Sequence, residues 1–321
     1  MGQNDHDIDT KEPAKKVNTP YDDVFRTLLN DCRMLLLPVL NEVFGEEYTG
    51  NEQILYSKNE HYLNKQDGEE DERITDASFV VVGKVTKSYL FECQSTSDSS
   101  MLVRIFEYAT QIALDEGAII ENKLKVTIPN SAVLFLRSTR NTPDKMQIEI
   151  ETPGGSVSFD VFVMKVKEYD LNQIFEKDLL FLIPFYIFNY GSQKQLEELE
   201  EDSEKLEALE NEYQLIVERL NALTEEGKLS AYYRMTILEM SGKVVENLAA
   251  QYEKVVKGVK DIMGGTVLDY KAKDILREGE MAGKKEMVIN MHKDGVKEDL
   301  IAKYANVSIE LVRKWIGLQP V

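Results

Sequence analysis

The stretch RITDASFVVVGKVTKSYLFECQ, residues 73–94, decides the fold that the sequence predicts. Segments 74–82 and 88–94 are rich in Val, Phe and Tyr, a composition typical of β-strands, and the intervening GKVTK is typical of a turn. We therefore expect a β-hairpin. Each predicted strand carries one acidic residue near the same end of the hairpin, Asp76 in the first and Glu92 in the second.

The spacing of these acids suggests a metal site. Glu92 and Gln94 are two residues apart, so in a strand their side chains share a face while Cys93 points to the other. An antiparallel partner can place Asp76 beside Glu92, where the two carboxylates would repel each other and be costly to desolvate. Mg²⁺ would remove this cost because it takes hard oxygen ligands and needs few from the protein. Two solvated acids at strand ends are the alternative.

Sequence patterns on both sides of the hairpin predict an α/β domain over residues 19–191. Thr19 can cap a helix that starts near Pro20, and the apolar spacing continues to about Gly45. The remaining predicted elements are a helix over 101–115, a buried strand over 131–136 and a second hairpin over 148–166.

The sequence beyond residue 191 becomes helical and acidic. Segment 196–226 contains twelve Asp or Glu and two basic residues, and so supplies −10 of the net charge of −19. We expect an acidic helical region over 192–263 and a further helical region over 264–321. The end of the latter (296–316) has the pattern of a helix-turn-helix, which generic helical hairpins share. The apolar residues of the acidic region alternate at spacings of three and four, as in a short coiled-coil seam: Leu206, Leu209, Tyr213, Ile216, Leu220 and Leu223. Either a homodimer through this seam or a helical hairpin packed on itself would explain it.

Composition limits the other classes of protein. Residues 1–18 are polar, and we expect a disordered lead-in. The longest apolar run, 179–188, is about half the length of a membrane span, which predicts buried core and no membrane partner. The two cysteines, Cys32 and Cys93, suit a reducing cytoplasm. The net charge of −19 argues against tight nonspecific binding to nucleic acid.

A series of motifs resembles the Rpn family of recombination-promoting nucleases, whose members are associated with DNA cleavage and mobile elements and are also described as transposases. The motifs are, in order, DDVFR at 22–26, RITD at 73–76, FECQ at 91–94, and Arg104 with Tyr108 one helical turn later. The resemblance covers roughly residues 20–190.

The resemblance implies a restriction-endonuclease-like PD-(D/E)XK core, a central mixed sheet flanked by helices, followed by an all-α C-terminal region. Asp76 and Glu92 would bind the metal with the carbonyl of Cys93 as a further ligand, Gln94 would occupy the usual lysine position, and Asp22 would be the acid of the first helix. Two departures stand out. Gln94 supplies no positive charge for the transition state, and Thr75 stands where the motif's name has proline.

Arg104 and Tyr108 lie four residues apart on one helix face, where they could reach a DNA phosphate. Alternatively, Arg104 bridges Glu107 or Asp98 and Tyr108 packs over the sheet. The first hypothesis is therefore a Mg²⁺-dependent or Mn²⁺-dependent DNA endonuclease that hydrolyses phosphodiester bonds. The second is a catalytically degenerate nuclease fold that acts as a binding or assembly module. The residues do not distinguish cleavage from the strand transfer of a full transposase.

Overall fold

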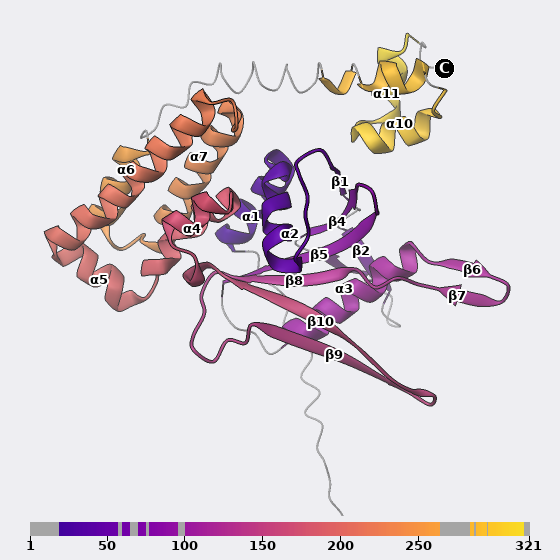
Figure 1. The fold of residues 1–321 in the computed structure, drawn as a ribbon, viewed down its shortest axis with the longest axis horizontal. Coiled ribbons are helices and arrows are strands. Elements are labelled where there is room, and N and C mark those ends of the chain that lie inside the picture. Colours follow the sequence, from indigo (N-terminus) through magenta and orange to yellow (C-terminus); the bar gives the residue numbers. More distant parts are fainter. Residues whose placement is uncertain are drawn as a thin grey trace, which may run out of the picture.

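The computed structural model describes residues 19–56, 77–95, 100–263, 283–285, 287–293 and 295–317, and the backbone alone for 60–64 and 70–74. Its centre is a six-stranded mixed sheet of order β1-β4-β5-β8-β10-β9 (Figure 1). The strands are β1 (Gln53–Tyr56), β4 (Ala77–Val82), β5 (Lys87–Gln94), β8 (Asn130–Phe135), β9 (Lys145–Thr152) and β10 (Gly155–Lys165).

Strand pairing confirms both predicted hairpins. β4 pairs antiparallel with β5, and β9 with β10. The first hairpin is shorter than expected, because β4 begins at Ala77 while Ile74 ends another strand, β3 (Glu70–Ile74), which pairs with β2 (Glu60–Asn64). β8 lies between β5 and β10 and pairs parallel with both. The sheet is therefore mixed, as the expected fold class requires.

Helices cover both faces of the sheet (Figure 1). One large cluster of buried side chains lies between one face and α1, α2 and η3, and a second cluster lies between the other face and α3. These helical elements are α1 (Pro20–Asp31), η1 (Arg33–Leu35), α2 (Leu36–Phe44), α3 (Met101–Asp115), η2 (Val166–Glu168), α4 (Leu171–Glu176) and η3 (Leu180–Tyr190). The apolar run 179–188 is buried, as predicted, and forms most of η3. No helix within the described ranges is long and apolar enough to cross a membrane.

The start of α1 follows from its sequence. Thr19 and Asp22 form a capping box, in which the Asp22 carboxylate accepts a hydrogen bond from the Thr19 backbone N–H at 2.7 Å. Pro20 occupies the first turn, where its missing N–H costs nothing. α2 ends at Gly45, whose φ of +67° is a left-handed conformation that favours glycine.

The acidic helices complete the large cluster. α5 (Gln193–Glu201), α6 (Ser203–Glu225), α7 (Ala231–Leu248) and α8 (Glu253–Ile262) all contribute buried residues to it, and α7 packs against η3 and α1. Buried residues on both sides of the domain boundary expected near residue 191 belong to this one cluster.

The predicted seam is the buried side of α6, since Leu209, Tyr213, Ile216 and Leu220 are fully buried within the chain. This agrees with the alternative in which the helical region packs within its own chain. A dimer through the seam would need these side chains at the surface, so that expectation is corrected.

The C-terminal helices have a small core of their own. α10 (Glu298–Ala305) and α11 (Ile309–Trp315) bury Ile301, Ala305 and Val312 with Val288. Asn306, at φ +50°, ends α10, and Ser308 caps α11. The predicted helix, turn and helix are thus present. Residues 1–18, where we expected a lead-in, lie outside the described residues.

Tyr213 provides a test of the packing around α6. It is fully buried, and its hydroxyl has no hydrogen-bond partner among the described residues, while Tyr186 and Tyr190 donate to the neighbouring Glu212 at 3.0 and 2.7 Å. A buried hydroxyl without a partner costs about 1–3 kcal/mol. Tyr213→Phe should therefore raise the free energy of unfolding by about 1 kcal/mol.

The same substitution has a pH signature. Burial, with a smaller effect of Glu212, raises the pKa of Tyr213 above its ordinary value, so the unfolded chain loses this proton at lower pH than the folded one. The wild type must therefore lose stability as the pH rises above about 10, and Tyr213→Phe should lose less. Urea unfolding at pH 8 and pH 10.5 measures both effects. A Tyr213→Phe variant less stable than the wild type at pH 8 would contradict this account.

Candidate functional site

The structure confirms that Glu92 and Gln94 share a face of β5. Tyr89, Phe91 and Cys93 belong to the large cluster on the α1 side, whereas Leu90 belongs to the cluster under α3. Because side chains alternate along a strand, Glu92 and Gln94 project toward the α3 side and Cys93 does not. Glu92 is 1% exposed and Gln94 is 7% exposed. A carboxylate buried this deeply in an apolar sheet is a strong candidate for a functional group.

The end of the β4–β5 ladder lies next to these residues. Ala77 pairs with Phe91, and Asp76 and Thr75, which precede Ala77 in the chain, lie outside the described residues. The carbonyl of Gln94 accepts a hydrogen bond at 2.8 Å from the backbone N–H of Leu136, the residue after β8. This carbonyl therefore points to the β8 side of β5. Since successive carbonyls of a strand point to opposite sides, that of Cys93 points to the β4 side. A backbone oxygen is therefore directed toward the side from which Asp76 would come.

The side chain of Gln94 has a donor that no other described residue uses. Its Nε2 is buried and has no hydrogen-bond partner within the part of the chain that the structure describes. Buried amide groups normally have partners, and one that lacks them marks a place for a ligand or water. The amide can donate to a phosphate oxygen or to a water, but it cannot neutralise charge as a lysine would.

Asp22 has a structural task in this protein. Its carboxylate caps α1, and the same helix packs Val24 and Phe25 into the large cluster, on the face of the sheet opposite to α3. Phe25 lies 5.6 Å from Phe91, ring centre to ring centre. Asp22 is 3% exposed. The structure thus places Asp22 at the start of a helix on the Cys93 side of the sheet.

Arg104 and Tyr108 lie on one face of α3, as their spacing predicts, but that face is turned to the sheet. Arg104 is 6% exposed and Tyr108 is 5% exposed, and Tyr108 belongs to the cluster under α3. Tyr108 therefore packs over the sheet, the structural alternative. An approach of DNA to these two side chains from the surface is not supported, because the helix itself covers them. Asp98, one proposed partner of Arg104, lies outside the described residues.

The loop after β8 was missed by the sequence analysis. β5 and β8 are parallel, so their carboxyl ends reach the same edge of the sheet, and Arg137 follows there directly. The guanidinium of Arg137 lies 5.2 Å from the centre of the Phe188 ring. Its positive charge partly offsets the rise in the pKa of Tyr21 that burial causes. Loops at the carboxyl ends of parallel strands commonly carry functional groups, and this rule could have found Arg137.

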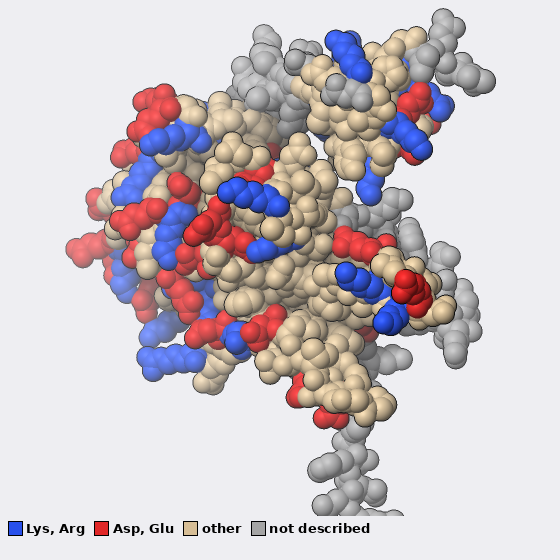
Figure 2. Space-filling model, turned by 45° about the vertical axis from the view of Figure 1, so that its right-hand side comes forward, with Lys and Arg blue, Asp and Glu red and all other residues tan. Residues whose placement is uncertain are grey.

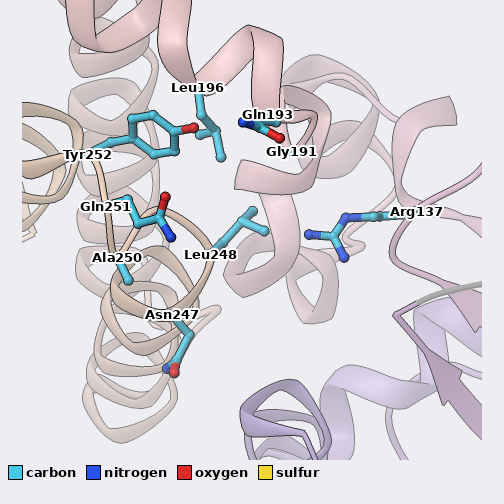
Figure 3. Close-up of a pocket in the computed structure, with 9 residues that line it drawn as sticks. All are labelled: Arg137, Gly191, Gln193, Leu196, Asn247, Leu248, Ala250, Gln251 and Tyr252. Carbon is cyan, nitrogen blue, oxygen red and sulfur yellow. The ribbon is translucent and has the colours of Figure 1, made fainter.

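Two cavities open beside this loop. One of about 740 Å³ is lined by residues 138–144 with Lys165, Lys167 and Glu168. Lys165 is buried there and pairs with Asp144 and Glu168, whereas Arg140 and Lys167 are exposed and have no ion-pair partner among the described residues. The other, of about 450 Å³, is shown in Figure 3, where Arg137 enters from the sheet side and Gln193, Asn247 and Gln251 come from the helical segments. The edge of the sheet near Gln94 is thus lined with exposed cationic and amide groups.

Within the described ranges, no group of three or more His, Cys, Asp or Glu side chains could hold a metal ion. That search does not include Asp76. Comparison with protein-family models, with curated proteins and with solved structures found no significant match.

Proposed function

We propose that this protein is a Mg²⁺-dependent endonuclease that hydrolyses DNA phosphodiester bonds. The observation that carries the proposal is the deeply buried Glu92 carboxylate at the end of the β4–β5 ladder, beside a Gln94 amide that has an unused donor. If the register from Ala77 and Phe91 continues by one residue, Asp76 stands opposite Glu92 on the same face. The mixed sheet flanked by helices agrees with the resemblance to the Rpn nucleases and their PD-(D/E)XK core.

The donor set suits Mg²⁺. Asp76 and Glu92 would hold the ion through carboxylate oxygens, and the carbonyl of Cys93 points to the β4 side. When bound, the ion would supply an activated water and would stabilise charge on the phosphate. Gln94 would donate a hydrogen bond to a phosphate oxygen or to the attacking water through Nε2. The site lies at the sheet edge that Arg137 and Arg140 flank, so the DNA backbone would approach from there.

A nicking assay with supercoiled DNA and purified full-length protein tests this function. We expect open-circular DNA in the presence of Mg²⁺ or Mn²⁺ and none after chelation with EDTA. The absence of a positive charge at Gln94 favours the second candidate, a catalytically degenerate binding module. Binding of DNA without cleavage in either metal would support that candidate and defeat the enzymatic proposal.

The loop after β8 supplies a prediction about substrate affinity. Arg137 and Arg140 would neutralise DNA phosphates, and each such contact contributes roughly one unit to the slope of log affinity against log salt. The double variant Arg137→Gln/Arg140→Gln should bind DNA more weakly, reduce that slope by about two, and raise KM with little change in kcat. The matched control is Lys194→Gln, on α5 and 85% exposed. An unaltered salt slope in the arginine variant would exclude this docking path.

A further inference from the structure

Two β-hairpin arms project from the same side of the protein (Figure 1). One consists of β6 (Ala118–Ile120) and β7 (Lys123–Lys125), which form a two-stranded sheet by themselves. The other is the outer part of the β9–β10 hairpin, where β9 is an edge strand of the central sheet. Among the described strands, no other strand pairs with the outer sides of β7 and β9. Such open edges present unpaired backbone groups that can bind another strand.

The β6–β7 arm exposes large apolar side chains. Ile119 is 80% exposed, Leu124 is 58% exposed and Ile120 is 55% exposed. Ile119 and Leu124 pair across the arm and so share one face, while Lys123 and Lys125 lie on the other face of β7. A two-stranded hairpin is at best marginally stable on its own in water. Both the short arm and its apolar face would be stabilised by a further strand.

The outer edge of β9 matches this pattern. Its residues alternate, with Ile148 and Ile150 toward the apolar face that packs near α3, and Glu149 and Glu151 on the opposite, exposed face. Val157, the cross-strand partner of Ile150, is 60% exposed. Hydrophobic residues therefore alternate with acids on β9, just as Leu124 alternates with two lysines on β7.

The charges of the two arms are complementary. Lys123, Lys125, Glu149 and Glu151 are exposed, and none of them has an ion-pair partner among the described residues. Figure 2 shows basic side chains on the β6–β7 arm, with acidic ones beside them, and acidic side chains toward the tip of the β9–β10 arm; Glu121 is exposed in the turn between β6 and β7. Side-by-side pairing of β7 with β9 would place lysines next to glutamates on one face and Leu124 next to isoleucines on the other. Within one chain β7 and β9 belong to separate sheets and are not paired with each other. A second copy of the chain can supply the complementary edge to each.

We propose that two copies of this chain form a symmetric dimer in which β7 of each copy pairs with the outer edge of β9 in the other. A two-fold axis perpendicular to the plane of the two arms places the β6–β7 arm of each copy beside the β9–β10 arm of the other. The same contact therefore occurs twice in the dimer. The central sheet of each protomer then gains the strands of its partner's arm. This interface is independent of the nuclease site and of the α6 seam.

Charge reversal tests the proposal by sedimentation velocity of the full-length protein. The wild type should be a dimer. The variant Lys123→Glu/Lys125→Glu carries acids on both arms, and Glu149→Lys/Glu151→Lys carries bases on both. Each variant alone should dimerise at least about a hundredfold more weakly, because like charges would face each other twice. An equal mixture of the two should form dimers again, since both contacts then join opposite charges.

The control variant, Glu176→Lys/Glu207→Lys, makes the same change in net charge as Glu149→Lys/Glu151→Lys, at exposed positions on α4 and α6, and should leave the dimer intact. Far-ultraviolet circular dichroism checks that the variants fold. A monomeric wild type would overturn the proposal. So would a dimer that neither charge reversal weakens, or two monomeric variants whose mixture stays monomeric.

Discussion

Glu92→Gln and Asp76→Asn should each reduce Mg²⁺-dependent DNA cleavage by about a thousandfold, which corresponds to about 4 kcal/mol of transition-state stabilisation. Each amide keeps the shape of the acid it replaces and removes the charge that holds the cation. Initial rates of nicking at saturating DNA and Mg²⁺ measure the effect. Because both acids would act through one ion, the double variant should cleave DNA at nearly the same rate as the less active of the two single variants.

The matched control is Glu176→Gln, an exposed acid on α4, which should cleave like the wild type. Thermal unfolding supplies a readout that does not depend on activity. An ion bound only to the folded wild type stabilises it by about 2.7 kcal/mol at one hundred times its Kd, and both single variants should lose this Mg²⁺-dependent rise in Tm. Full cleavage by Glu92→Gln would remove Glu92 from the site, and additive effects of the two substitutions would show that they do not share an ion.

Local patterns predicted the local parts of the fold. The alternation around Glu92 located β5 and the direction of its side chains, because side-chain period in a strand is set by backbone geometry alone. The start of α1 at Thr19 and Pro20 was equally predictable, since its cap is made by residues three apart. The candidate pair at Glu92 and Gln94 rests on this same short-range logic.

Contacts between segments far apart in the sequence could not be predicted from those local patterns. The parallel pairing of β8 with both β5 and β10 joins segments far apart in sequence, and no local signal encodes it. Without that topology, Arg137 could not be placed at the edge of the sheet near Gln94. The spacing of Arg104 and Tyr108 predicted that they share a face of α3, but it could not say that this face is turned inward, because polar and apolar residues occur on it together.

The α6 seam illustrates the same limit. The spacing of its apolar residues is the same whether they pack against a second chain or against other helices of the same chain. Which of the two occurs depends on η3 and α7, which lie elsewhere in the sequence. In the structure, α7 packs directly against η3, and Ile237, Met240 and Val244 are buried there. A boundary at residue 191 would therefore cut through one continuous core.

A chain truncated after Gly191 should consequently fail to fold. Removing α5–α8 would uncover η3 and part of α1, and each fully buried large apolar side chain that becomes exposed costs about 1.5–3 kcal/mol. A few such residues exceed the total stability of about 5–15 kcal/mol that is typical of a folded protein. The expected result is the loss of a cooperative thermal transition and of near-ultraviolet circular dichroism.

A chain truncated after Met263 is the matched control. It keeps α5–α8 and loses the C-terminal helices, whose buried cluster around Ile301 and Val312 shares no residue with the large cluster. This chain should unfold cooperatively, with a Tm within a few degrees of that of the full-length protein. If instead the chain ending at Gly191 unfolded cooperatively, the α/β part would be an independent domain, and the packing of α7 on η3 would not be required for the fold of the central sheet.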